Sequence, residues 1–182
     1  MSQQEQRNNH MQYGMTLCSH TLNNSTDSNE LFFTAITQIN HGGPSVVSDP
    51  NQRRILSLLN LKAGRLSIVL SDYASALSLF EHGISYLEGD HWTGHYKISL
   101  DLFDAAAEAA CVLNKNSEVT SYTEQIVAHA KSFGDSLNCE QMCDMFFMLL
   151  EKLLTTLCNL IKLLLPNNIC RFSCLCKVSS AS

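Results

Sequence analysis

The sequence has few charged residues, and it has no long run of basic side chains. Charged residues make up 16% of its 182 residues, against roughly 25% in typical soluble domains. The net charge of −5 disfavours binding along a phosphate backbone, so we expect no nucleic-acid partner. Hydrophobic residues make up 45% of the chain, which is enough to build the core of one domain.

The sequence also lacks the short motifs by which many enzymes bind nucleotides, metals or reaction intermediates. Gly42 and Gly43 are followed by Pro44, and not by the lysine that ends a phosphate-binding Walker A loop. Kinase signatures and the G-x-S-x-G nucleophile motif are missing. The cysteines of residues 170–176 have the spacing C-x3-C-x-C, which differs from the paired C-x2-C spacing of zinc sites. We therefore predict a non-catalytic chain that binds no cofactor and no metal.

The first residues, 1–14, contain no apolar stretch of the kind that forms a secretory signal, and arginine is scarce among them. We therefore expect a cytoplasmic protein whose cysteines are reduced. Because residues 1–26 are polar and show no apolar periodicity, we predict that this segment is disordered.

From residue 27 onward, apolar side chains recur at the three- and four-residue steps of amphipathic helices. Asp49 before Pro50 is a helix-start signal, because the carboxylate accepts hydrogen bonds from free N–H groups and proline has no N–H to satisfy. The later helices have candidate N-caps at Ser71 or Asp72, Thr93 and Ser117. Helices are predicted over residues 29–39, 50–70, 73–87, 94–113 and 118–133. The apolar face of the second is predicted to consist of Ile55, Leu58, Leu59, Ala63, Leu66 and Leu70.

Four small or aromatic residues, Gly64, Ala76, Phe80 and Gly83, are separated by intervals of 12, 4 and 3 residues. This spacing resembles that of the small and aromatic positions of a tetratricopeptide repeat, and Tyr73 matches a further position. The resemblance implies an all-α fold of antiparallel helical hairpins, stacked as a TPR-like α-solenoid over residues 49–137. A short helix and turn over residues 27–45 would precede it. Such solenoids usually bind other proteins, so we predict a protein-interaction or scaffold module.

In repeats of this kind the first helix of each pair lines the concave side. With Gly64 at the eighth position, the resemblance places Leu61, Arg65 and Ile68 in a partner groove. Arg65 would meet a carboxylate or phosphate there, the alternative being a solvated surface residue. Asp101, Asp104 and Glu108 lie at three- and four-residue steps, which is typical of a solvated helix face. Because solenoids usually need about three repeats for stability, we also expect either association with another chain, including self-association, or marginal stability.

A second resemblance covers residues 30–137 and is to the helical-repeat region of large predicted-ATPase (AAA-type) signalling proteins. The similar segments are residues 31–40, 49–65, 71–87 and 91–110. Its most specific part consists of Trp92, His95, Tyr96, Leu100, Leu102 and the run Ala106-Ala107-Glu108-Ala109. In that family an ATPase module precedes the repeats, and a kinase, histidine kinase or cyclase module commonly lies elsewhere in the chain. The resemblance implies ATPase or kinase signalling components as partners.

Two other functions are compatible with the sequence. In the first alternative, the chain is a fragment of an ATP-dependent signalling enzyme that acts with a separate catalytic chain. In the other it is a membrane-associated helical protein that uses the leucine-rich residues 142–165. Charged residues interrupt that segment, which is costly inside a bilayer. We therefore expect residues 138–182 to form a Leu/Cys-rich helix with an irregular tail, and we expect no membrane insertion.

Overall fold

The computed structural model describes residues 2–23, 29–87, 89–132 and 156–157. Over these residues the chain is helical and contains no strand, which confirms the all-α prediction. The chain divides into one unit of residues 1–140 and another of residues 141–182. Of the second unit only Thr156 and Leu157 are described, and both are helical. The rest of the predicted Leu/Cys-rich helix and tail lies outside the described residues.

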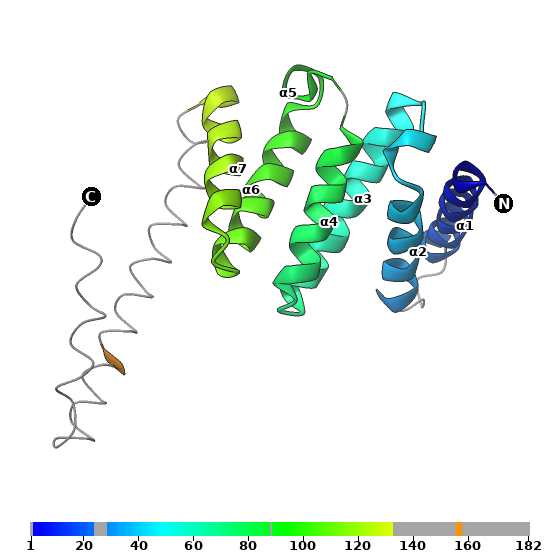
Figure 1. Cartoon of the computed structure of the whole chain (residues 1–182), viewed down its shortest axis with the longest axis horizontal. Coiled ribbons are helices and arrows are strands. Elements are labelled where there is room, and N and C mark those ends of the chain that lie inside the picture. Colours follow the sequence, from blue (N-terminus) through cyan, green and yellow to red (C-terminus); the bar gives the residue numbers. More distant parts are fainter. Residues whose placement is uncertain (1, 24–28, 88, 133–155, 158–182) are drawn as a thin grey trace. The chain divides into compact units, whose positions relative to one another are not determined.

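The helices of the first unit follow one another in chain order (Figure 1). The main contacts join α1 to α2, α3 to α4, α4 to α6, and α6 to α7, with a smaller contact between α2 and α3. Their bounds are α1 Gln3–Asn23, α2 Asn29–Gly42, the 3-10 helix η1 Pro44–Val46, α3 Pro50–Val69, α4 Tyr73–Tyr86, α5 His91–Gly94, α6 Tyr96–Val112 and α7 Asn116–His129.

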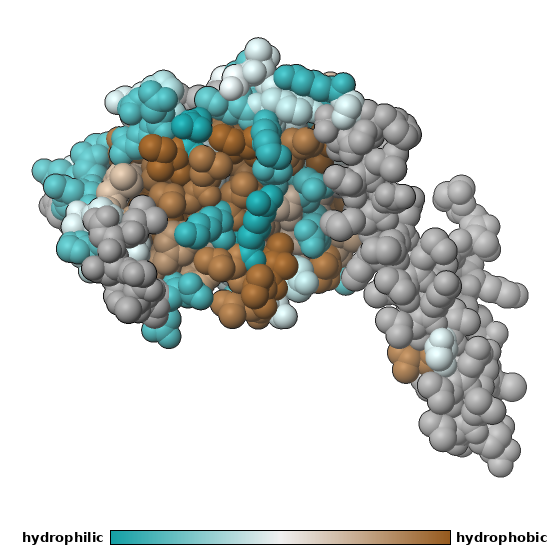
Figure 2. All heavy atoms as spheres, turned by 180° about the vertical axis from the view of Figure 1, so that it is seen from behind, coloured by the Kyte–Doolittle hydropathy of each residue, from teal (hydrophilic) through white to brown (hydrophobic). Residues whose placement is uncertain are grey.

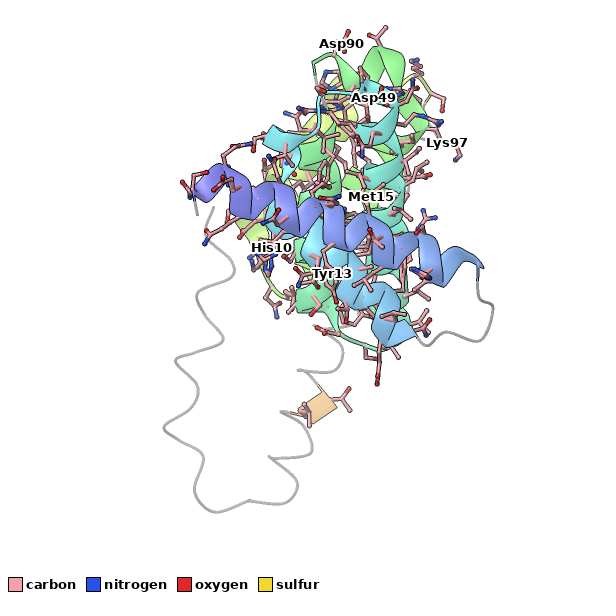
Figure 3. All side chains as sticks on the ribbon, turned by 90° about the vertical axis from the view of Figure 1, so that its right-hand side faces the viewer. His10, Tyr13, Met15, Asp49, Asp90 and Lys97 are labelled. Atoms are coloured by element: carbon pink, nitrogen blue, oxygen red, sulfur yellow. The ribbon has the colours of Figure 1, made fainter. Side chains whose placement is uncertain are left out.

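The prediction that residues 1–26 are disordered is wrong, because Gln3–Asn23 form α1. Its packed side consists of residues spaced three or four apart, among them Met11, Gly14 and Cys18, which are buried. A Cβ atom on Gly14 would lie 2.7 Å from the backbone nitrogen of Ile39, so α1 approaches α2 very closely at this glycine. In Figure 3, His10 and Tyr13 lie on one side of α1 and Met15 on the other. A few apolar side chains and one close contact with α2 thus anchor a helix that is otherwise polar.

Local signals set the start of α3 and the turns that follow α3 and α6. Asp49 accepts hydrogen bonds from the backbone N–H groups of Asn51 and Gln52, which confirms the predicted cap. Asp72 caps α4 by accepting from the N–H of Ser75 at 3.0 Å. The residues after α3 and α6 adopt the left-handed conformation, with φ of 61° at Ser71 and 57° at Asn114. Both turns therefore end their helices in the same way.

The predicted helix over residues 94–113 is wrong at its start. The short helix α5 begins at His91, and its cap is Asp90, which accepts from the N–H of Thr93 at 3.3 Å. His95 separates α5 from α6 with a φ of −134°. Ser117 lies inside α7 and does not cap it, since that helix begins at Asn116.

The buried face of α3 differs from the predicted one. Ile55, Leu58 and Leu70 are exposed, although the apolar pattern placed them inside. Three polar residues are buried in their place, namely Ser57, Asn60 and Ser67. Hydrogen bonds satisfy two of them: the Ser57 hydroxyl donates to the carbonyl of Arg53 at 3.1 Å, and the Asn60 amide donates to the carbonyl of Leu56 at 3.0 Å.

Three clusters of buried side chains hold the first unit together. One joins α1, α2 and α3 and includes Tyr86 of α4, whose hydroxyl donates to the carbonyl of Ile39 at 2.9 Å. Another joins α3, α4 and α6 around Phe80. The third fastens α5 to α6 and α7 through Trp92, with contributions from Phe103, Ala107 and Ile126. Each helix is therefore positioned by its contacts with neighbouring helices.

Candidate functional site

The exposed side of α3 carries apolar and basic residues in one line, which we call the α3 stripe. It consists of Ile55, Leu58, Lys62, Arg65 and Val69, whose spacing of three and four residues places them on one helix face. The apolar members are 47%, 38% and 79% exposed, in chain order. Figure 2 shows the side of the molecule opposite to that in Figure 1, where hydrophobic side chains gather in the middle of the face with hydrophilic ones between them.

A row of three carboxylates on α6 adjoins the α3 stripe. This carboxylate row consists of Asp101, Asp104 and Glu108, all of them partly buried. Figure 3 shows Asp49 and Asp90 at the same end of the unit, so α3 and α6 begin at that end and run in the same direction. The stripe and the row are joined by an ion pair, in which Nη2 of Arg65 lies 3.8 Å from Oδ1 of Asp101.

The surroundings of Asp104 and Glu108 disfavour negative charge. Burial raises the pKa of Asp104, and the neighbouring charge of Asp101 raises it further, whereas Arg65 acts in the opposite direction. Burial likewise raises the pKa of Glu108, with Asp104 as the second cause and Arg65 again opposing. The row is therefore not the fully solvated face that its spacing predicts, because each of the three residues is partly buried.

The predicted groove residues Leu61, Arg65 and Ile68 lie in different surroundings. Arg65 is exposed, as a residue that meets a partner must be. The placement of Leu61 in a groove is wrong, because the side chain is 5% exposed and belongs to the cluster around Phe80. Ile68 is partly buried and packs against the same cluster. The apolar residues that do reach the surface are Ile55, Leu58 and Val69, which the sequence pattern did not single out for binding.

The residues that resemble repeat positions meet at the contacts of α4. A Cβ atom on Gly64 would lie 2.2 Å from Cε1 of Phe80, and one on Gly83 would lie 2.7 Å from Cδ2 of Leu102. Ala76 and Phe80 are fully buried, and Tyr73 is partly buried against the same cluster. Close approach of α3 and α6 to α4 is therefore possible only because of these two glycines.

Two open cavities lie at the surface of the first unit. One, of about 450 Å³, is lined by α1 together with Val46 and Gln52. The other, of about 510 Å³, lies between α2 and α4 and contains His41 and His82. Burial lowers the pKa of His82, while the charge of Glu81 opposes this effect and the charge of His41 adds to it. In the part of the chain that the structure describes, no group of three or more His, Cys, Asp or Glu side chains is placed to hold a metal ion.

Comparisons with known proteins give no relative of this chain. No family model matches it, and neither a curated protein nor a solved structure does so. The resemblance to repeats of ATPase-linked signalling proteins therefore stays a prediction. Among the helices of the described ranges, none is both long and apolar enough to cross a bilayer. The membrane alternative concerned residues 142–165, which lie outside these ranges except for Thr156 and Leu157.

Proposed function

We propose that this protein is a non-catalytic protein-interaction module, and that the α3 stripe with the adjoining carboxylate row is its binding surface. The observation that carries the proposal is the exposure of Ile55, Leu58 and Val69 on one helix face beside charged residues. Apolar side chains aligned on one helix face, with charged side chains between them, form the kind of patch that binds proteins, whereas singly scattered apolar residues do not. A chain that folds such a patch onto its surface gains stability when a partner covers it.

We further propose that the helices form TPR-like hairpins of a short α-solenoid, and that the partners are cytoplasmic signalling proteins. Two features support the hairpin arrangement. The glycine-to-aromatic contact of Gly64 with Phe80 is the kind of close approach that the repeat spacing implies. The turns after α3 and α6 use the same left-handed residue position, at Ser71 and Asn114. The signalling partners rest on the sequence resemblance.

Affinity purification with mass spectrometry tests the proposed function. The intact chain would be compared with an Ile55→Asp, Leu58→Asp variant, which places charge on the exposed patch and leaves the buried Leu61 unchanged. The matched control is Tyr13→Asp, Val127→Asp, because Tyr13 and Val127 are exposed side chains of other helices. We expect partners that are lost from the α3 variant and retained by the control.

Circular dichroism would establish that both variants remain helical. An identical set of partners for the intact chain and the α3 variant would contradict the proposal, as would the loss of the same partners from both variants. The first result would mean that the α3 stripe does not bind, and the second that exposed apolar residues act without regard to position.

A further inference from the structure

On the binding surface, the basic side chains have partners among the described residues and two of the acidic side chains do not. The basic side chains have contacts within the chain: Arg65 and Lys97 lie 3.8 and 3.7 Å from the Asp101 carboxylate. Lys62 places its ammonium group 5.2 Å from the centre of the Phe32 ring. By contrast, among the described residues no hydrogen bond or ion pair involves the side chains of Asp104 and Glu108. The cations are engaged, and these two carboxylates are not.

The two carboxylates are also partly removed from water, which makes the missing partner matter. A carboxylate that loses hydration without gaining a cation or a donor is less stable than one in solution. The nearest cation, Arg65, is shared with Asp101 and does not offset the effect of burial on Asp104 or Glu108. An ammonium or guanidinium group from outside the chain would gain a charge-assisted hydrogen bond with little further loss of hydration by the protein.

The spacing of the charged and apolar residues defines the occupant further. Asp104 and Glu108 are four residues apart on α6, which separates their Cβ atoms by about 6 Å. Basic side chains three or four residues apart on a second helix have the same separation. Ile55 and Leu58 lie ten and seven residues before Arg65 on α3, nearer the N-terminal end of that helix than the ion pair with Asp101. A partner helix that runs along α3 would cover their exposed apolar area with an apolar stretch of its own.

We infer that this surface binds an amphipathic helix of another protein, with lysine or arginine side chains over Asp104 and Glu108 and apolar side chains over Ile55 and Leu58. The inference rests on the proposed function and adds the chemistry of the partner to it. Recognition by an amphipathic helix in this manner uses apolar anchors for affinity and charge for orientation. An acidic segment is disfavoured, because it would bring like charge to a row that already repels its own charges.

A pair of synthetic peptides tests the inference on the full chain. The first is a fluorescein-labelled amphipathic helix of leucine, alanine and lysine, and the second has glutamate in place of every lysine. Fluorescence anisotropy near neutral pH and moderate salt would give both affinities. We expect the lysine peptide to bind at least about tenfold more tightly, a ratio that corresponds to roughly 1.4 kcal/mol. Equal affinities, or tighter binding of the glutamate peptide, would overturn the inference.

Charge-neutral variants separate local recognition from the overall charge of the protein. Asp104→Asn, Glu108→Gln removes the two unpartnered charges and keeps the shapes of the side chains. Glu30→Gln, Glu124→Gln changes the net charge by the same amount at exposed positions of α2 and α7. We expect the first variant to lose about tenfold in affinity for the lysine peptide and the second to bind like the intact chain. Equal losses from both variants would mean that only net charge matters.

Different experimental results would contradict the inference and the proposed function. In one case the Ile55→Asp, Leu58→Asp variant loses its cellular partners, whereas Asp104→Asn, Glu108→Gln keeps them and still binds the lysine peptide. The proposed function would then hold and the inference would fail, because the surface would bind proteins without using these two carboxylates. Sedimentation of the intact chain tests another possible occupant of this surface, namely a second copy of the chain. A dimer that Leu58→Asp dissociates would show that the surface is a self-association interface and would overturn the inference.

Discussion

Gly64 of α3 lies directly against Phe80 of α4, where a Cβ atom on residue 64 would come within 2.2 Å of the ring. Because that distance is far below any real contact, we expect Gly64→Ala to push the two helices apart. Overpacking of this kind costs about 1–3 kcal/mol, and the clash with a fully buried ring places it near the upper end. The roughly 1 kcal/mol that alanine gains over glycine in a helix does not offset this cost. Urea denaturation followed by circular dichroism would measure the difference.

Gly94 provides the control for this substitution. It lies in α5, and nothing approaches the position that its Cβ atom would occupy within 4 Å. We expect Gly94→Ala to leave the free energy of unfolding unchanged or slightly raised. Similar destabilisation by both substitutions would show that the contact with Phe80 is not the cause.

Asn40 and Asn60 join α2 to α3 by two reciprocal amide hydrogen bonds, of 2.8 and 3.1 Å. Asn60 is fully buried and donates in addition to the carbonyl of Leu56 at 3.0 Å. Replacing Asn60 by alanine leaves the Asn40 amide without its partner, so we expect a loss of about 1–3 kcal/mol in unfolding free energy. If the pair acts as a unit, the double variant Asn40→Ala, Asn60→Ala will lose less than the sum of the single variants. Strict additivity would contradict this reading.

Because of Tyr86, the free energy of unfolding is expected to depend on pH in the alkaline range. Burial of the phenol, which donates to the Ile39 carbonyl, raises the pKa of Tyr86 well above its usual value. The folded state therefore holds the proton more tightly than the unfolded state. This stabilisation is complete below the unfolded pKa of about 10 and is lost as the pH rises toward the raised folded pKa.

Denaturation at a series of pH values would test this dependence. We expect the stability of the intact chain to fall above about pH 10, and the fall to be smaller in Tyr86→Phe, which has no ionisable group. At neutral pH the same variant is expected to lose about 1 kcal/mol, because the hydrogen bond from the phenol to the Ile39 carbonyl is lost while that carbonyl still accepts from the N–H of Gly43. Parallel curves for the two proteins would exclude Tyr86 as the source of the alkaline transition.

Glu108 is expected to destabilise the free protein at neutral pH. Its pKa is raised, chiefly by burial, so the folded state penalises the charged form. The penalty is absent below the unfolded pKa of about 4.3, and it develops as the pH rises through the raised folded pKa. Glu108→Gln should therefore raise stability near pH 7 but not near pH 4, as urea denaturation at the two pH values would show. A variant that is less stable than the intact chain near pH 7 would contradict the account of the carboxylate row.

The binding surface illustrates why sequence patterns predicted the helix but not its faces. The predicted apolar face of α3 includes Ile55 and Leu58, which are apolar, and leaves out Asn60, which is polar. In the structure the assignment is reversed, since Asn60 satisfies its amide through Asn40 and Leu56. A hydrophobic pattern contains no information about a hydrogen-bond partner on another helix. The predicted buried face of α3 is therefore rotated about the helix axis relative to the observed one.

The sequence by itself determined where α3 and α4 begin. Asp49, Pro50 and Asp72 act on backbone groups within three residues of themselves, so their effect is local and is the same in any fold. Tertiary structure alone decided that α1 forms, that Leu61 is buried, and that Arg65 lies among carboxylates of α6. Those outcomes depend on contacts between residues that are far apart in the chain, and their free energy exists only once the helices have packed together.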